Sequence, residues 1–269
     1  GIYKCCYVGS KVNEEPLHKL LEIKEYLQCS EIKHRKFIVV ADSLYKVIQA
    51  IGSPVYNTYF LMLDEIDSYQ SDSPFRESMA NTLDYYFEFD RDKRCMVTAT
   101  LKEFSHPALH EEPIVEIDYT NTPKRKVSLI HTDNPNQIVK ERIEELYNTG
   151  EKIVIAYNKI QFIRQIIENL SDELQGECAI LCSSMSVMYA GVYYQESFEN
   201  NRLTKRINFI TCTYFMGIDI REKFHLISVS NVEYLFCLLP IEKLAQIAGR
   251  GRKGLLGETI IYNTKSQAD

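Results

Sequence analysis

Short apolar runs alternate with longer segments of helical spacing in the first part of the chain. The apolar runs, each of strand length, are 2–8, 37–41, 59–63 and 95–100. Apolar residues recur at helical intervals in the segments between them, 16–27, 44–50 and 75–87. Asp42 and Ser43 precede the second of these segments and are suited to cap a helix there. This alternation predicts a layer of parallel strands covered by helices.

The same alternation begins again at Val127. The expected strands are 127–131, 153–157, 179–182, 207–213, 224–230 and 258–262. The expected helices are 136–148, 160–170, 241–248 and a Met- and Tyr-rich stretch that follows Cys182 and ends near Asn200. Before them, 114–119 has strand character, and 120–126 is short, polar and contains a proline, as in a linker. We therefore predict two α/β domains, 1–120 and 127–269, of which the first is incomplete.

Composition narrows the class of protein. The chain of 269 residues is 45% apolar and 25% charged, which is ordinary for a soluble globular protein. It has no apolar run of transmembrane length and no signal-like opening, so we expect a cytoplasmic protein without a membrane partner. The formal net charge of −6 argues against a broad basic surface for duplex DNA. It does not exclude a narrow basic groove, because basic residues are grouped locally at 124–126, 202–206 and 250–253.

The eight cysteines are scattered, and several lie within apolar runs. They are typical of small core residues in a reducing compartment. Cys178 and Cys182 form a C-x3-C pair, but no second pair or nearby histidine completes a zinc site, so a place in the core is the favoured interpretation.

The apolar run 59–63 is followed at once by Asp64 and Glu65. Such a run predicts a strand buried on both faces, and open α/β sheets place their chemistry at the carboxyl ends of strands. One carboxylate there can hold Mg²⁺ through water while the other orients a hydrolytic water. The alternative is an ordinary solvated turn.

Three further stretches at strand ends or turns carry unusual residues. They are Thr98-Ala99-Thr100, Thr211 to Asp219 (TCTYFMGID) and Gln246 to Lys253 (QIAGRGRK). The last places two arginines and a lysine after a helix, with glycines that allow close backbone approach, and this suits a phosphate chain. The alternative for such a run of charges is a solvated surface.

The order of these stretches resembles the superfamily 2 helicases, the DEAD-box-like ATP-dependent helicases and translocases. Asp64-Glu65-Ile66-Asp67 is similar to their motif II, Thr98-Ala99-Thr100 to motif III, Thr211 to Asp219 to motif V, and Gln246 to Arg252 to the motif VI form Q-x-x-G-R-x-R. More loosely, 37–47 is similar to the segment before motif II that touches nucleic acid, and 153–158 to motif IV. The resemblance runs from about residue 37 to 262. It implies two RecA-like parallel-sheet domains, the first incomplete.

The resemblance also implies roles for individual residues at the nucleotide, with ATP and Mg²⁺ as cofactors. Asp64 would bind Mg²⁺ through water, and Glu65 would polarise the attacking water. Arg250 and Arg252 would be arginine fingers on the γ-phosphate. Nearer the rest of the nucleotide would lie Gln246, Gly217 and Asp219.

Other roles concern coupling and the nucleic acid. Residues implied to couple the two domains are Asp67, Thr98 and Thr100. Residues implied to lie near the phosphate backbone of DNA or RNA are Ser43, Thr211 and Thr213. The acidic residues and Mg²⁺ would lie on one domain and the arginines on the other, and both would be needed for phosphoryl transfer. The reaction would therefore depend on closure of the two domains. The motifs do not specify whether the nucleic acid is DNA or RNA or in which direction the protein moves along it. They also do not specify whether the protein separates strands or only tracks along one.

The sequence departs from the family pattern in two places. Lys253 stands where many members have a final arginine. The phosphate loop G-x-x-x-x-G-K-[ST] requires a Gly-Lys step, and none of the eleven glycines is followed by lysine. The nearest stretch is 9–12, GSKV. We expect the loop to lie upstream of Gly1 in a larger parent protein with further domains, and the chain to be inactive and to bind nucleotide weakly without it.

Two alternatives to a fragment of an ATP-dependent helicase or translocase remain. One is a non-hydrolysing nucleic-acid-binding or scaffolding module that keeps the helicase-like shape. The other is an unrelated two-domain α/β enzyme that uses Asp64 and Glu65 on Mg²⁺.

Overall fold

The computed structural model divides the chain into two compact units, Gly1–Val115 and Glu116–Asp269. It describes residues 4–9, 16–66, 77–99, 106–118, 125–215 and 217–264. Most of the predicted linker, 120–126, lies outside these ranges. No helix within them has the length and apolar character to cross a membrane.

The second unit contains a seven-stranded sheet in which every pair of neighbours is parallel. Its strands, in sheet order, are β5 (Val127–His131), β11 (Gly257–Tyr262), β10 (His225–Ser230), β6 (Ile153–Ala156), β9 (Ile207–Ile210), β7 (Cys178–Leu181) and β8 (Tyr194–Gln195). Helices flank this sheet, which confirms the predicted α/β class and gives the unit a RecA-like fold.

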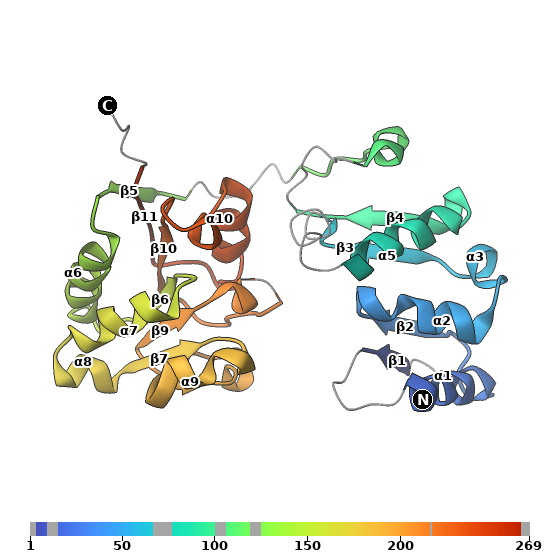
Figure 1. Ribbon diagram of the computed structural model, residues 1–269, viewed down its shortest axis with the longest axis horizontal. Helices are drawn as coiled ribbons and strands as arrows, with labels where there is room; N and C mark the ends of the chain where they lie inside the picture. The colour runs from blue at the N-terminus through green and yellow to red at the C-terminus, as the bar shows by residue number, and fades with distance from the viewer. Residues whose placement is uncertain are drawn as a thin grey trace. The chain divides into compact units, whose positions relative to one another are not determined.

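Helices cover both faces of this sheet (Figure 1). They are α6 (Pro135–Tyr147), α7 (Ile160–Glu168), α8 (Asp172–Gly176), α9 (Val187–Ala190) and α10 (Ile241–Ala248). Alternate residues of β6 point to opposite faces. Ile155 belongs to the core that α6 and α7 cover, and Val154 to the core that contains Ile247 of α10. Strands β6, β7 and β9 are buried throughout, as central parallel strands require.

The first unit contains two separate pairs of parallel strands. The first pair is β1 (Cys5–Val8) and β2 (Lys36–Val39), with helices α1 (Pro16–Gln28) and α2 (Leu44–Ile51). The second pair is β3 (Leu61–Asp64) and β4 (Arg94–Val97), with helices α3 (Val55–Thr58) and α5 (Glu77–Glu88). Each pair has a small core of its own, around Ile23 and Val8 in the first and around Leu63 and Tyr86 in the second.

Short 3-10 turns occur between these elements. They are η1 (Ala41–Ser43), η3 (Arg91–Lys93), η4 (Pro107–Glu111), η5 (Ser184–Ser186), η6 (Gly191–Tyr193), η7 (Glu199–Asn201), η8 (Cys212–Tyr214) and η9 (Leu235–Cys237). The expectation that Ser43 caps α2 was wrong, since its side chain makes no capping hydrogen bond.

The expectation that the strand before Asp64 is buried on both faces was also wrong. Leu63 is 5% exposed, but Met62 and Phe60 are each 59% exposed. Only one face of β3 packs on a core, because α5 and Tyr86 cover that face alone among the described residues. An unbroken apolar run therefore did not distinguish a two-sided strand from a strand with one open face.

Two other predicted elements are absent from the described residues. Ile114, Val115 and Ile117 are 70%, 84% and 73% exposed, and residues 114–118 form no strand. The long helix expected after Cys182 is instead η5, the four-residue α9, η6 and β8, because the chain turns at Gly191, whose φ is +60°. Residues 114–118 have strand propensity but no partner strand to pair with in the described part of the chain. In the stretch after Cys182, a glycine interrupts the helical spacing.

The cysteines fit a mainly structural role. All eight are free, and four of them, Cys6, Cys178, Cys182 and Cys237, are buried. Burial raises the pKa of the Cys178 thiol to about 12, so this thiol stays neutral. Cys212 differs from the expectation, since it is exposed in η8 rather than part of a strand.

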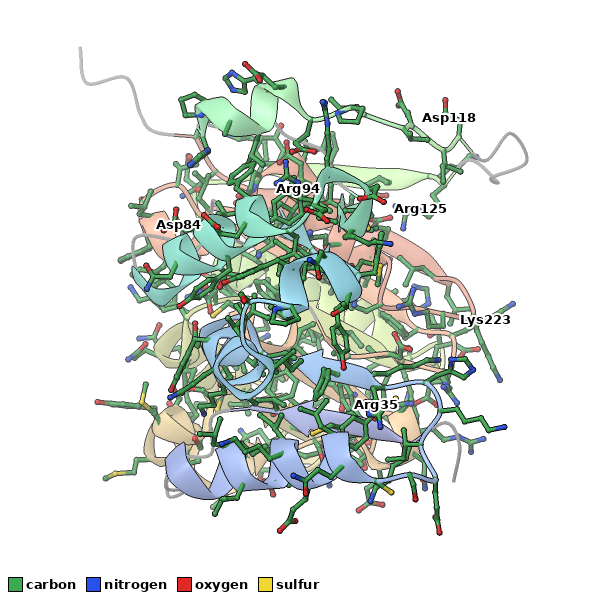
Figure 2. All side chains as sticks on the ribbon, turned by 90° about the vertical axis from the view of Figure 1, so that its right-hand side faces the viewer. Arg35, Asp84, Arg94, Asp118, Arg125 and Lys223 are labelled. Atoms are coloured by element: carbon green, nitrogen blue, oxygen red, sulfur yellow. The ribbon has the colours of Figure 1, made fainter. Side chains whose placement is uncertain are left out.

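Arg94 organises the second half of the first unit (Figure 2). Its Nη1 donates to the backbone carbonyls of Tyr86, Phe87 and Phe89, at 3.4, 2.8 and 3.2 Å. Its Nη2 lies 2.6 Å from Oε1 of Glu112, and this pair is largely buried. One guanidinium thus ties the end of α5 to the chain after η4.

Candidate nucleotide and nucleic-acid sites

Two loops of the second unit form a short parallel bridge between Ile220 and Gly251, which are 31 residues apart in sequence. The amide of Ile220 donates to the carbonyl of Arg250 over 2.9 Å, and the amide of Arg252 donates to the carbonyl of Ile220 over 3.0 Å. Ile220 is fully buried. The bridge therefore fixes the stretch that ends at Asp219 beside the two arginines.

The side chains in this bridge are engaged with one another. Arg252 Nε donates to Asp219 Oδ1 over 2.6 Å, and the two side chains are 53% and 37% exposed. Arg250 donates from Nε to the carbonyl of Gln246 over 3.0 Å and from Nη1 to the carbonyl of Ile218 over 3.4 Å. An ion pair this exposed contributes only about 0–1 kcal/mol. Arg252 can therefore exchange Asp219 for another anion, such as a phosphate oxygen, at little cost.

Local packing explains why the sequence folds in this way here. Helix α10 buries Ile247 and Ala248 in the core and ends at Ala248, with Gly249 as its C-cap. A Cβ on Gly251 would lie 2.9 Å from Leu255 Cδ2 and 3.3 Å from the ring of the buried Phe224, so a side chain at this position would require both neighbours to shift. Gln246 is itself buried, at 5% exposure.

In the first unit, the carboxyl ends of β3 and β4 bring Asp64, Glu65 and Thr98 close together. Asp64 lies opposite Val97 in the parallel register, and Thr98 follows directly. Asp64 is exposed, and its Oδ1 accepts the amide of Glu65 over 3.0 Å. Glu65 has a φ of +53°, which is uncommon for a residue other than glycine and is typical of strained functional sites. Asp67 and Thr100 lie outside the described residues.

The residues expected near a nucleic-acid backbone differ in their exposure. Thr211 is buried, and its hydroxyl donates to the carbonyl of Leu181 over 3.3 Å. Thr213 is exposed in η8, at the carboxyl end of β9. Gly217 is also exposed, with a φ of +74°. Ser43, in the first unit, is 1% exposed.

Asn158, to which the sequence gave no role, joins the loops at this end of the sheet. It follows β6, the strand between β9 and β10. Its Oδ1 accepts the amide of Cys212 over 3.0 Å, and its Nδ2 donates to the carbonyl of Phe236 over 2.8 Å. The thiol of Cys237, whose pKa burial raises to about 11, donates to the Asn158 carbonyl over 3.5 Å. The loose likeness of 153–158 to motif IV was the signal in the sequence, but it did not reveal these contacts, because the partners lie 54 and 78 residues away.

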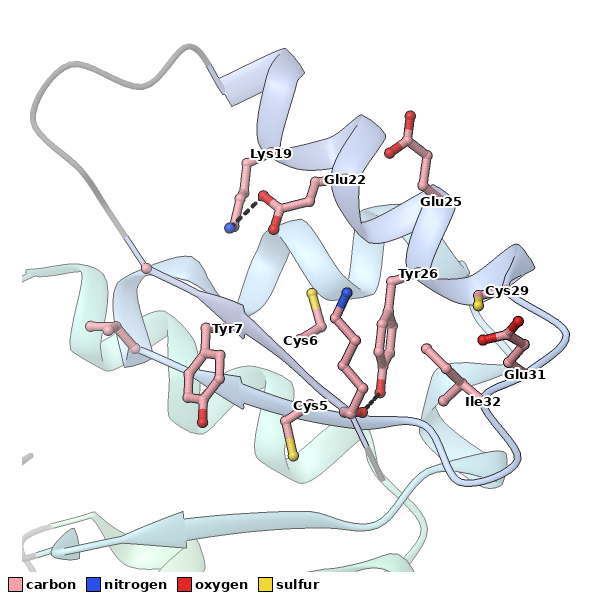
Figure 3. Close-up of a pocket in the computed structure, with 13 residues that line it drawn as sticks. Cys5, Cys6, Tyr7, Lys19, Glu22, Glu25, Tyr26, Cys29, Glu31 and Ile32 are labelled. Atoms are coloured by element: carbon pink, nitrogen blue, oxygen red, sulfur yellow. Dashed lines mark hydrogen bonds and ion pairs between the residues drawn. The ribbon is translucent and has the colours of Figure 1, made fainter. Parts of the chain in front are cut away.

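A separate cavity of about 1020 Å³ lies along β1 in the first unit (Figure 3). An ion pair of Lys19 with Glu22, at 2.6 Å, and the hydroxyl of Tyr26, which donates to the carbonyl of Lys4 over 2.8 Å, form parts of its wall. Val40, in the stretch 37–47, lines this cavity, but none of the predicted site residues does. It is therefore not the candidate site.

Two solved structures are similar to the chain. The structure of Mycobacterium smegmatis helicase Lhr bound to ssDNA and AMP-PNP is 12% identical with a TM-score of 0.56, and the match covers 97% of this chain and 35% of that one. The yeast DEAD-box splicing factor Prp28 is 14% identical with a TM-score of 0.39, and the match covers 98% of this chain and 57% of that one. No family model and no curated protein sequence matches the chain. The likeness to Lhr shows that the chain shares the fold of that part of the structure.

Proposed function

We propose that this chain forms most of the motor core of an ATP-dependent nucleic-acid helicase or translocase. The observation that carries the proposal is the bridge at Ile220 and Gly251, which sets Asp219 beside Arg252. In the helicase motifs that these stretches resemble, the residues at the positions of Asp219 and Arg252 lie at the same bound nucleotide. The similar structure of Lhr was solved with ssDNA and AMP-PNP, which supports the same two ligand classes for this chain.

In this proposal both units contribute residues to the hydrolysis of one ATP. Asp64 is an exposed carboxylate, the oxygen ligand that Mg²⁺ prefers, and would hold the ion through water. When bound, Mg²⁺ would neutralise charge on the β- and γ-phosphate oxygens. Glu65 polarises the attacking water, and Arg250 and Arg252 stabilise the charge that develops on the γ-phosphate.

The remaining proposed roles concern the nucleotide and its coupling to nucleic acid. Gln246 and Gly217 lie near the nucleotide, and Asp219 near its ribose. Thr213 contacts the phosphate backbone of DNA or RNA. The residues proposed to connect nucleotide and nucleic-acid sites are Asp67, Thr98 and Thr100, and those proposed to support the nucleic-acid site are Ser43 and Thr211.

The test is steady-state ATP hydrolysis by the intact natural protein, with and without single-stranded nucleic acid. Glu65→Gln is expected to abolish hydrolysis stimulated by nucleic acid while leaving the affinity for ATP nearly unchanged. Glu88→Gln, at an exposed position at the end of α5, is the matched control and is expected to hydrolyse ATP normally.

The same assay addresses the alternative of a non-hydrolysing binding module. A wild-type protein that binds single-stranded nucleic acid but hydrolyses no ATP would support it and overturn the motor proposal.

A further inference from the structure

The loop that follows β10 presents three large apolar side chains to solvent. Leu235, Phe236 and Leu238 are 85%, 57% and 46% exposed. The loop is closed by hydrogen bonds from the Asn231 amide to the Cys237 carbonyl, at 3.2 Å, and from the Cys237 amide to the Tyr234 carbonyl, at 2.8 Å. Because Cys237 is fully buried, the loop is anchored in the core while Phe236 stays at the surface.

Asn158 holds this loop next to the loop that contains Thr213. The two hydrogen bonds of its side chain, to the Cys212 amide and the Phe236 carbonyl, span β9 and β10 on either side of β6. Phe236 and Thr213 therefore lie in two loops at the same end of the sheet, and Asn158 bonds to both loops. The exposed ring is positioned before any ligand arrives, which lowers the entropy cost of binding.

A cation accompanies the ring. Nζ of Lys159 lies 3.1 Å from the ring centroid of Tyr234, 4.1 Å from that of Phe162 and 5.7 Å from that of Phe236. The cluster thus combines a fixed ammonium group with an exposed aromatic face. Single-stranded nucleic acid requires this combination, because its bases stack on rings while its phosphates attract cations. An apolar protein partner would gain nothing from an ammonium group beside the exposed ring.

We propose that Phe236 stacks on a base of a single strand whose backbone passes the Thr213 loop, with Lys159 facing a phosphate of that strand. The inference rests on the proposed nucleic-acid function and adds the surface that holds the bases. Asn158 is a positioning residue, since it acts through the Phe236 and Cys212 loops. Stacking is tolerant of sequence, so the site selects single strands rather than a base sequence.

Binding of a fluorescein-labelled oligothymidylate to the chain, measured by anisotropy, tests the inference. Phe236→Leu keeps the apolar character and removes the ring, and it is expected to weaken binding about tenfold. The matched control is Phe60→Leu, because Phe60 is also exposed, at 59%, but lies in the first unit. Its affinity is expected to equal that of the wild type.

An abasic strand of equal length separates stacking from backbone contact. The wild type is expected to bind it more weakly than oligothymidylate, and Phe236→Leu to bind it as the wild type does. Equal affinity of Phe236→Leu and wild type for oligothymidylate would overturn the inference and leave the proposed function standing. A wild type that binds neither strand would overturn both the inference and the proposed function. A patch that only docks a protein would give either this result or equal binding of oligothymidylate by Phe236→Leu and the wild type.

The chain contains no tryptophan, so Phe236→Trp introduces a single indole reporter. Stacking on a base is expected to quench its fluorescence on addition of oligothymidylate and not on addition of the abasic strand. A merely structural Phe236 predicts equal emission with both strands. Asn158→Ala in the same background is expected to reduce the quenching, because the loop is no longer held.

Discussion

Arg252 and Asp219 form an ion pair of 2.6 Å between two loops whose backbones are already joined by a parallel bridge. Because both side chains are substantially exposed, we expect the pair to hold the guanidinium in place rather than to stabilise the fold. Asp219→Asn should lower the free energy of unfolding by about 1 kcal/mol or less, measured by urea denaturation. A loss of several kcal/mol would mean that the pair is a structural element of the second unit.

A side chain at Gly251 is expected to destabilise the second unit. In Gly251→Ala the new methyl group would press on Leu255 and on the buried ring of Phe224, at a cost of about 1–3 kcal/mol. Gly176→Ala is the control, because a Cβ there meets no atom within 4 Å. Thermal unfolding of the two variants checks this. Equal melting temperatures of Gly251→Ala and Gly176→Ala would show that the loop around Gly251 adjusts to the methyl group and that its close packing on Phe224 is not required.

Glu258 provides a pH-dependent prediction. Its side chain is 5% exposed, with Oε2 at 3.6 Å from Arg125 Nη1. Burial raises the pKa of the carboxyl above its ordinary value of 4.5, and Arg125 only partly opposes the shift. The folded state thus binds the proton more tightly than the unfolded state. The stability contributed by the protonated form is fully present below about pH 4.5 and is lost as pH rises through the raised pKa.

Glu258→Gln, which keeps the shape without the charge, should therefore be more stable than the wild type at pH 7, and the difference should shrink toward pH 4. Urea unfolding across this range measures the effect, with Glu141→Gln as the control at an exposed carboxylate. If the variant were less stable at pH 7, attraction to Arg125 would outweigh the cost of burial.

Asn158 is expected to protect the Cys212 amide from exchange with solvent, because its Oδ1 accepts that amide in an exposed loop. Asn158→Ala should accelerate hydrogen exchange at Cys212 by at least about tenfold, with little change at β9. Asn148→Ala removes a comparable surface bond, from Nδ2 to the Glu144 carbonyl, and should leave Cys212 unchanged. Unaltered exchange in Asn158→Ala would show that the loop is held by other contacts.

The sequence predicted the second unit better than the first, for a physical reason. Strands such as Ile153–Ala156 and Ile207–Ile210 are buried throughout, so their unbroken apolar runs match their environment. In the first unit, Met62 lies on an open face, and its apolar character suggested a second covering layer that the described residues do not contain. Exposed Ile114, Val115 and Ile117 show the same weakness, since apolar residues alone do not specify a partner strand.

Only the residues of the candidate site that lie in recognisable motifs were predictable from the sequence. The resemblance to the helicase motifs pointed to Asp219, Arg250 and Arg252, and the structure brings these into adjacent loops. It did not point to Phe236, and it gave Asn158 no role beyond the loose likeness of 153–158 to motif IV, because the importance of both residues comes from contacts between segments far apart in sequence. Nor did it reveal that Thr211 is buried while Thr213 is exposed, since that depends on how η8 turns after β9.

The central claim is that Arg250 acts on the same triphosphate as the carboxylates Asp64 and Glu65. Single-turnover ATP hydrolysis by the intact natural protein tests this most directly, with Arg250→Ala compared with Arg221→Ala, which removes an exposed arginine of the same unit. We expect Arg250→Ala to lose hydrolysis stimulated by nucleic acid, as Glu65→Gln does, with ATP affinity largely retained, and Arg221→Ala to behave as the wild type. Normal hydrolysis by Arg250→Ala, with Glu65→Gln inactive, would contradict the claim.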